Sequence, residues 1–446
     1  MKRKLIALLS GMMLLSMALG ACGKSESDTK KDVKGGSSDG NVELRFASWQ
    51  SNFKEEDERA AEEYKKLHPN VTVKFEYYGD QNTREYDKKV DLMILGDEGL
   101  DITMSGSYMQ HARRAGAGSY VDLGPLFEAE GVKSDDIYSF SPVVNGKQYG
   151  ISGDWKTWFV LLNKNMLDEA GLEVPPLDWT WDDYAEYAKK LTVGEGASKR
   201  YGSYFHTWGN YDFMAATSVK MGSPYYKEEG VLTFDEPYWK EWLQYRYKLE
   251  SEDGASTPFT DVKAMNMNYR SKFFNEEVAM MPTGSWMIPE LSDQSKFPHD
   301  FVTTFAPLPR WSDGGEAGRT YTEAQYYSIP RTSKHVDEAY EFLRWYTTEG
   351  LVLRGVSVPN TKDVNKAEAL KGLISDQQYV DTEALEKVFN NPEWEDNVDM
   401  MVPSYTDDME KIVLEECDKY LLGEQDVDKT IDNMMTKGND LIQSSK

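Results

Sequence analysis

Tryptophan and hydrogen-bonding side chains occur together at several places in this chain of 446 residues. The pairs are Trp49 with Gln50, Asp154 with Trp155, and Trp208 with Asn210. An indole gives a large, stiff apolar surface with one polar tip, and a neighbouring carboxylate or amide adds a planar hydrogen-bonding group. This combination suits the binding of a ligand that has both apolar faces and hydroxyl groups.

The patterns of common catalytic and metal sites are missing from the sequence. The five histidines are scattered without metal-binding spacing, and there is no P-loop, H-E-x-x-H motif or EF-hand loop. The stretch 36–40 matches the nucleophile pattern G-x-S-x-G, but no strand precedes it and no helix follows it. We therefore predict no metal, no cofactor and no enzymatic activity.

Composition and charge exclude further classes of protein. Lys and Arg total 50 against 76 Asp and Glu, a net charge of −26, which argues against nucleic-acid binding because that affinity comes from neutralising phosphates. Two cysteines cannot build a disulfide scaffold. The hydrophobic content of 40% and the chain length predict a globular protein of two or three domains. Tyr (27) and Trp (12) together outnumber Phe (17), so most aromatic rings carry a polar group.

The first 22 residues resemble the signal of a bacterial lipoprotein. Three basic residues at 2–4 precede an uncharged apolar stretch at 5–19, which is too short for a comfortable membrane-spanning helix. The sequence LGAC at 19–22 is similar to the lipobox, whose cysteine is lipidated and becomes the mature N-terminus. The resemblance implies a signal peptide at 1–21 and a lipid anchor on Cys22. An ordinary signal peptide followed by a chance cysteine is the alternative.

The residues after Cys22 predict a tether rather than a domain. Residues 23–41 have no apolar periodicity and no aromatic side chain, so we expect a flexible segment that spans about 24 Å. No later segment approaches 18 consecutive apolar residues. We expect the protein at the extracellular face of the cell membrane, held there by the lipid.

The chain after residue 41 predicts an α/β fold. A strand at 42–46, a helix ending at 67 and a strand at 71–75 form a β–α–β unit with parallel pairing. Further strands are expected at 100–104, 158–162 and 322–330, and further helices at 86–95, 180–191, 333–348 and through most of the last 80 residues. Thr180 and Asp183 form a capping box at the start of one of these helices.

Four stretches resemble the extracellular solute-binding proteins of carbohydrate ABC importers, the group that includes maltose-binding protein. They are LDI at 100–102, the run from LNKNML to WTWD at 162–182, FNEEVAMMPTGSW at 274–286, and SIP with the following helix at 328–342. Glu276 stands where the family usually has Gly, and Asp101 follows Leu rather than Pro. The resemblance covers nearly all of the chain after the tether.

The resemblance implies a two-lobed periplasmic-binding-protein fold, in which each lobe is a mainly parallel sheet flanked by helices and a hinge joins the lobes. We place the crossings near residues 152, 310 and 362. The expected organisation is signal peptide 1–21, tether 22–41, first lobe 42–151 and 311–362, and second lobe 152–310 and 363–446. The implied function is that of a monomer that binds a carbohydrate between the lobes and delivers it to the permease of an ABC importer.

Strand ends and predicted crossings supply the candidate binding residues, because ligands bind at the carboxyl ends of strands and in clefts between domains. Trp286 follows a Thr-Gly-Ser turn, and in the family this aromatic residue often stacks on the sugar. The candidates are Trp49, Gln50, Ser105, Tyr108, Asp154, Trp155, Trp208, Asn210, Trp286 and Glu323, with Arg319 and Tyr321 as weaker ones. The aromatic helix at 238–247 is interpreted as core.

Other functions stay open at this point. With 76 carboxylates, a pair at glycosidase spacing of about 5–10 Å is compatible with the sequence, so a surface glycoside hydrolase is one alternative. A ligand-sensing partner of a membrane kinase would use the same cleft. A binder of peptides or polyamines would depend on acidic side chains more than on tryptophan.

Overall fold

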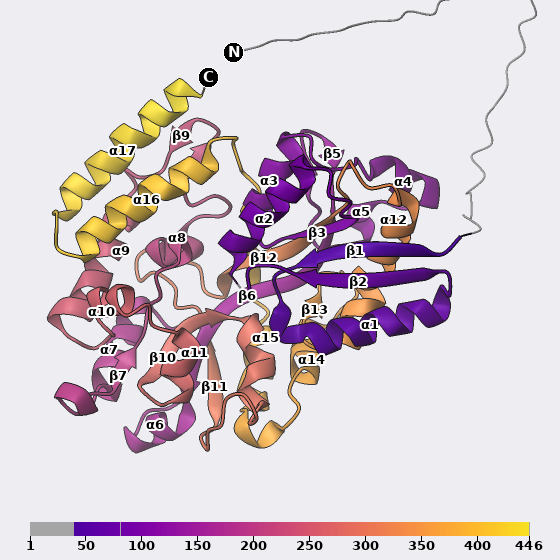
Figure 1. The fold of residues 1–446 in the computed structure, drawn as a ribbon. Helices are drawn as coiled ribbons and strands as arrows, with labels where there is room; N and C mark the ends of the chain where they lie inside the picture. The colour runs from indigo at the N-terminus through magenta and orange to yellow at the C-terminus, as the bar shows by residue number, and fades with distance from the viewer. Residues whose placement is uncertain (1–39, 81, 446) are drawn as a thin grey trace, which may run out of the picture. The chain divides into compact units, whose positions relative to one another are not determined.

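One mixed sheet runs through the part of the chain that the computed structural model describes, residues 40–80 and 82–445 (Figure 1). The strands in spatial order are β2 (Val71–Tyr77), β1 (Val42–Ser48), β3 (Ile102–Ser105), β12 (Arg319–Ser328), β6 (Ile151–Asn163), β10 (Val278–Gly284) and β7 (Tyr201–Ser203). Off this path, β11 (Thr303–Pro307) and β13 (Val358–Pro359) pair with β6, and β14 (Glu395–Asn397) pairs with β12. Two short hairpins are formed by β4 (Val143–Val144) with β5 (Lys147–Gln148), and by β8 (Tyr226–Glu228) with β9 (Val231–Leu232).

The signal peptide predicted for residues 1–21, the lipidation predicted at Cys22 and nearly all of the predicted tether lie outside the described residues. Within the described part, none of the helices combines the length and the apolar character that a membrane span needs.

The first lobe begins with the predicted β–α–β unit. Strands β1 and β2 pair in parallel with Val42 opposite Val71, and helix α1 (Lys54–Leu67) connects them. Strand β3 joins the other side of β1, also in parallel. The other helices of this lobe are α2 (Thr83–Leu95), α3 (Tyr108–Gly116), α4 (Gly124–Glu130), α5 (Ser134–Ile137), α12 (Val336–Trp345) and α13 (Leu351–Arg354).

Strand β6 belongs to both lobes. Its first half pairs antiparallel with β12 and β13, and its second half pairs antiparallel with β10 and β11. Parallel pairs join β1 to β2 and β3, β10 to β7, and β12 to β14, whereas all partners of β6 are antiparallel to it. The predicted two-lobed α/β fold class is confirmed, but a mainly parallel sheet occurs only in the first lobe, because β10 and β11 of the second lobe pair antiparallel with β6. The exact lobe boundaries near 152, 310 and 362 stay predictions.

The second lobe surrounds β10, β11 and β7 with helices. Thr180 accepts from the backbone of Asp183, whose carboxylate accepts from the backbone of Thr180, so the predicted capping box starts α7 (Trp181–Leu191). The predicted aromatic helix is α9 (Pro237–Tyr247), and its Trp239 and Trp242 are fully buried, as expected for core. The remaining helices are α6 (Lys164–Glu169), α8 (Met214–Val219), α10 (Phe259–Ala264), α11 (Tyr269–Phe274), α14 (Lys366–Gly372), α15 (Thr382–Phe389), α16 (Thr406–Leu421) and α17 (Val427–Ser444).

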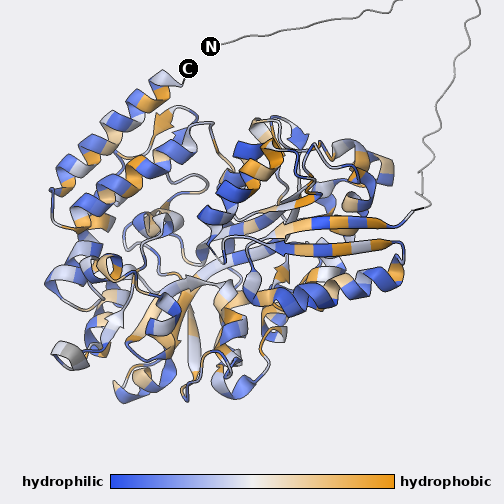
Figure 2. Cartoon of the chain, in the orientation of Figure 1, coloured by the Kyte–Doolittle hydropathy of each residue, from blue (hydrophilic) through white to orange (hydrophobic). Residues whose placement is uncertain are grey.

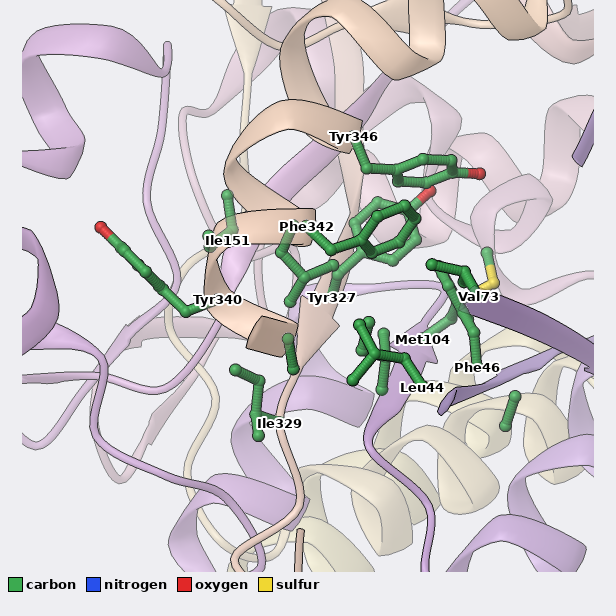
Figure 3. Close-up of a cluster of buried hydrophobic side chains, with 14 of the residues drawn as sticks. Leu44, Phe46, Val73, Met104, Ile151, Tyr327, Ile329, Tyr340, Phe342 and Tyr346 are labelled. Carbon is green, nitrogen blue, oxygen red and sulfur yellow. The ribbon is translucent and has the colours of Figure 1, made fainter. Parts of the chain in front are cut away.

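An aromatic cluster forms the core of the first lobe (Figure 3). Phe46 stacks on Phe75 with ring centroids 4.6 Å apart and meets the edges of Tyr327, Phe342 and Tyr346. Helix α1 covers this side with a mainly hydrophilic outer surface, whereas apolar and polar residues alternate along β1 and β2 (Figure 2). Burial of these rings is the main stabilisation of the lobe.

Replacing Phe46 with Ala is expected to lower the free energy of unfolding by about 3–5 kcal/mol, because it opens a cavity among rings that cannot collapse onto each other. Chemical denaturation monitored by circular dichroism measures the loss. Leu92→Ala on α2 is the control, since Leu92 is 65% exposed and its truncation should change stability by less than about 0.5 kcal/mol. Equal effects of the two substitutions would contradict the packing described here.

Candidate ligand-binding cleft

A cleft of about 470 Å³ lies where the two lobes face each other across β6. The first lobe contributes the end of β1 with the following 3-10 turn η1 (Ser51–Phe53) and the starts of α2 and α3. The second lobe contributes the 3-10 turn η3 (Gly209–Asp212), the helix α11, the 3-10 turn η5 (Ser285–Ser292) and the start of α16. Residues at the middle of β6 and of β12 form the floor between these walls.

Four aromatic side chains form the wall of the second lobe. Trp286 meets Trp158 nearly perpendicularly at 5.2 Å between ring centroids, and Trp208 meets Tyr269 in the same way at 5.2 Å. The indole N–H of Trp286 donates to the hydroxyl of Tyr269 at 3.1 Å. Trp208 and Trp286 remain partly exposed to the cleft. The wall therefore offers apolar ring surface that is held in a fixed arrangement by other rings.

The turn before Trp286 explains how this side chain reaches the cleft. A Cβ atom on Gly284 would lie only 2.0 Å from the six-membered ring of Trp286, so glycine is required there. The hydroxyl of Ser285 accepts from the backbone N–H of Thr157 on β6 at 3.3 Å. The predicted Thr-Gly-Ser turn thus ties the end of β10 to the floor strand and directs the indole inward.

The loop with Trp208 and Asn210 is fixed from below by α9. Trp242 Nε1 donates to the carbonyl of Tyr211 at 2.7 Å, and Arg246 Nη1 donates to the carboxylate of Asp212 at 2.9 Å. Arg246 is fully buried. The side chain of Asn210 lines the cleft and has no hydrogen-bond partner within the described residues, so its amide is free to bind a ligand.

The first lobe presents Trp49, Gln50 and Tyr108. Trp49 is largely buried, with its edge against Tyr86 at 5.1 Å between centroids. Gln50 Oε1 accepts from Arg354 Nη2 at 2.5 Å, and the Tyr108 hydroxyl donates to the carbonyl of Val143 at 2.5 Å. These contacts fix the orientation of all three side chains.

The floor carries opposite charges on adjacent strands. Lys156 on β6 and Glu323 on β12 are direct cross-strand partners, and both are partly exposed to the cleft. Burial raises the pKa of Glu323 to about 7, and the positive charge of Lys156 opposes that rise. Burial lowers the pKa of Lys156, opposed by the carboxylates of Asp154 and Glu323. Near neutral pH the carboxylate of Glu323 is therefore close to the point where it gains or loses a proton.

Asp154 is held by a buried network below the floor. Its Oδ1 accepts from the Tyr327 hydroxyl at 2.9 Å, and its Oδ2 lies 4.0 Å from Nη1 of Arg354. Arg354 forms its shorter ion pair with Asp57, at 2.6 Å. A Cβ on Gly153 would lie 1.9 Å from the ring of Tyr327, so the glycine lets this ring reach Asp154. Asp154 orients the floor more than it faces solvent.

All of the main sequence-predicted candidates except Ser105 line the cleft. Those that do are Trp49, Gln50, Tyr108, Asp154, Trp155, Trp208, Asn210, Trp286 and Glu323, and so does Tyr321. Ser105 is buried outside the lining, where its hydroxyl accepts from Arg114 at 3.4 Å. The weaker candidate Arg319 pairs instead with Glu395 at 2.7 Å. Their assignment as ligand-binding residues stays a prediction.

Trp155 lines the cleft but is mainly a core residue. It is 2% exposed, its indole N–H donates to Asp396 at 3.2 Å, and Lys366 lies 5.3 Å from the ring. The sequence interpretation missed other lining residues, which include Arg84, Lys156, Trp158, Tyr269, Arg270, Arg354 and Glu410. Lys156 and Trp158 had a usable signal, their positions two and four residues after Asp154 on the same face of a strand.

No group of three or more His, Cys, Asp or Glu side chains suited to a metal ion occurs among the described residues.

The profile of the bacterial extracellular solute-binding proteins matches residues 41–351. The chain belongs to this family. The solute-binding protein is 28% identical over 177 residues to the arabinooligosaccharide-binding protein of Halalkalibacterium halodurans, an alignment that covers 38% of the chain and 37% of that relative. It is 23% identical over 354 residues to the multiple sugar-binding protein of Streptococcus mutans, covering 77% of the chain and 79% of that relative.

A solved structure supports the fold of the solute-binding protein. The ABC substrate-binding protein of Listeria monocytogenes in complex with cycloalternan is 20% identical, with a TM-score of 0.74 over 91% of this chain and 98% of that one. At this identity the likeness concerns the fold, and it confirms the two-lobed architecture predicted from the sequence.

The raised pKa of Glu323 leads to a prediction about stability. The folded protein holds this proton up to about pH 7, whereas an unfolded glutamate loses it near pH 4.3. Folding stability due to this group therefore falls as the pH rises between these values. The thermal midpoint of the Glu323→Gln variant is expected to rise relative to that of wild type as the pH is raised from 5 to 8.

Differential scanning fluorimetry at several pH values measures this gain. Glu62→Gln is the control, because Glu62 lies on the exposed face of α1. A difference between the Glu323→Gln variant and wild type that does not change with pH would contradict the assignment.

Proposed function

We propose that the protein captures a sugar or short oligosaccharide in the cleft between its lobes and delivers it to the membrane subunits of an ABC importer. The observation that carries this proposal is the wall of Trp158, Trp208, Tyr269 and Trp286 beside a floor of hydrogen-bonding side chains. Sugar C–H faces pack on aromatic rings, and sugar hydroxyls bind carboxylates and amides. The names of the two relatives, arabinooligosaccharide-binding and multiple sugar-binding protein, support the same ligand class.

The charges that line the cleft favour a neutral ligand. Four cationic residues (Arg84, Lys156, Arg270 and Arg354) stand against four acidic ones (Asp154, Glu323, Asp399 and Glu410). A polyamine or a basic peptide would require more carboxylates than cationic groups in the cleft. The cleft has equal numbers of the two, although the whole chain has a net charge of −26. Burial also raises the pKa of Asp399 to about 6, which weakens the negative charge further.

Binding without cleavage is part of the proposal. A solute-binding protein needs affinity and closure of the lobes, for which periplasmic binding proteins are a known example. The protein acts as a monomer, and ATP is consumed by another subunit of the importer. A sensing role beside a membrane kinase would use the same cleft with a different partner, and co-purification with a permease or a kinase distinguishes the two.

The Trp286→Ala variant is expected to bind oligosaccharides at least several-fold more weakly than wild type, because it loses stacking surface that is partly exposed to the cleft. A thermal-shift screen of mono- and oligosaccharides, followed by calorimetry on the best ligand, measures this. Trp345→Ala is the control, since Trp345 packs on Tyr64 in the first lobe, away from the cleft. It should lower the thermal midpoint and leave the affinity unchanged.

If the Trp286→Ala variant lost stability but kept its affinity, Trp286 would be a core residue. If incubation with oligosaccharides gave shortened products, the protein would be a hydrolase. If only charged compounds bound to the protein and no sugar did, the carbohydrate proposal itself would be contradicted.

Membrane attachment through Cys22 is the second part of the proposal, and it is supported by the lipobox resemblance at 19–22. A Cys22→Ser variant is expected in the culture medium instead of the membrane fraction.

Cys417→Ser is the matched control, because Cys417 is buried in the second lobe and should not affect attachment. Immunoblots of membrane and medium fractions give the distribution. Membrane retention of the Cys22→Ser variant would refute the anchor.

A further inference from the structure

Two helices from different lobes face each other across the cleft. Helix α3 packs on β3 and β12 of the first lobe, and α16 packs on α9, α17 and η3 of the second. In Figure 1 the start of α16 comes close to α2 and α3. Tyr108 and Gln110 of α3 and Thr406 and Glu410 of α16 all line the cleft. The start of α16 thus forms the wall opposite to α3.

An ion pair joins these two helices directly. Nε of Arg113 on α3 lies 3.3 Å from Oδ2 of Asp407 on α16. The other end of the guanidinium is held on its own lobe, where Nη2 lies 2.9 Å from Oδ2 of Asp91 on α2. Arg113 is 38% exposed and Asp407 is 37% exposed, so solvent and salt reach the pair. Asp91 fixes the position of the arginine, and the contact with Asp407 crosses between lobes.

A second pair of opposite charges lies beside the first. Arg84 at the start of α2 and Glu410 on α16 both line the cleft, and neither has an ion-pair partner within 4.0 Å among the described residues. Burial raises the pKa of Glu410, and the positive charge of Arg84 opposes that rise. The two charges therefore already attract each other across the cleft.

An apolar contact brings the same helices together. Met400 and Val402, in the segment that leads into α16, pack against a first-lobe cluster of Tyr108 and Ala112 on α3 with Ala324 and Tyr326 on β12. This contact sets the distance at which the charges of α16 meet those of α2 and α3.

We propose that Arg113 and Asp407 are positioning residues for ligand capture, because their ion pair links the two walls of the cleft and favours the closed arrangement of the lobes. Arg84 and Glu410 act in the same direction. An exposed pair of this kind changes the ratio of closed to open molecules by about two- to five-fold, and salt screens it. The ion pair therefore shifts the equilibrium between open and closed lobes only slightly, and a bound ligand remains the main determinant of closure.

Double electron–electron resonance tests this proposal by measuring the distance between spin labels on the two lobes. The measurement is made without any carbohydrate, so the result does not depend on the proposed ligand. The labels replace Leu95 on α2, which is 83% exposed, and Asn439 on α17, which is exposed, in the full chain with Cys22→Ser. We expect Asp407→Asn and Arg113→Gln each to reduce the ratio of closed to open molecules by about two- to five-fold. Addition of 0.5 M sodium chloride to the parent protein should have a similar effect.

Asp408→Asn is the matched control. Asp408 is the next residue on α16 and pairs with Lys411 of the same helix at 2.7 Å, so its loss removes the same charge without touching the first lobe. The double variant Arg113→Gln/Asp407→Asn should open no further than either single variant, and Asp407→Glu should restore closure. Equal distance distributions for the Asp407→Asn and Asp408→Asn variants, or effects of the two single variants that simply add, would overturn the proposal.

Discussion

The arrangement of the binding cleft depends on one strand that is hydrogen-bonded to both lobes. The first half of β6 pairs with β12 and β13, and its second half pairs with β10 and β11. Any movement of one lobe against the other must therefore bend this strand or its neighbour β12, while the ladders on both sides resist slipping. The residues at the middle of β6, Asp154 and Lys156, are part of the cleft floor and part of the connection at once. Binding chemistry and lobe geometry are coupled because they use the same backbone.

Below that floor, the buried ion pair of Arg354 with Asp57 has an orienting role. Both side chains are 1% exposed, and burial of two charges costs about as much as their attraction returns. The pair therefore contributes little to the net stability of the fold. Arg354 also donates to Gln50 and approaches Asp154, so it fixes one residue of the first-lobe wall and one of the floor in the same position. A hydrophobic replacement of similar volume would keep the fold and release both cleft residues.

Local sequence signals predicted the fold well where they act over short distances. The alternation at 42–46 and the capping box at Thr180 correspond to real elements, and the order of motifs predicted the two-lobed architecture. The antiparallel strands around β6 were not predictable, since pairing between residues more than 100 positions apart leaves no local trace. The same limit explains the site. Trp286 could be found from its turn, but Tyr269 and Arg354 reach the cleft only through tertiary packing. Ser105 ends a strand, as the sequence predicted, yet it does not line the cleft because Arg114 covers it.

The contacts between the lobes differ in strength from the floor to the rim of the cleft, and this gradient suits reversible capture. At the floor, the backbone ladders that join β6 to strands of both lobes are too costly to break and stay intact. Farther out, Met400 and Val402 make a small apolar contact with the cluster that contains Tyr108. At the rim, the exposed ion pair of Arg113 with Asp407 contributes about 0.2–1 kcal/mol to the closed arrangement. Such a rim cannot hold the protein closed alone, so the free energy for full closure has to come from ligand contacts with both walls, and release requires only that those contacts be lost.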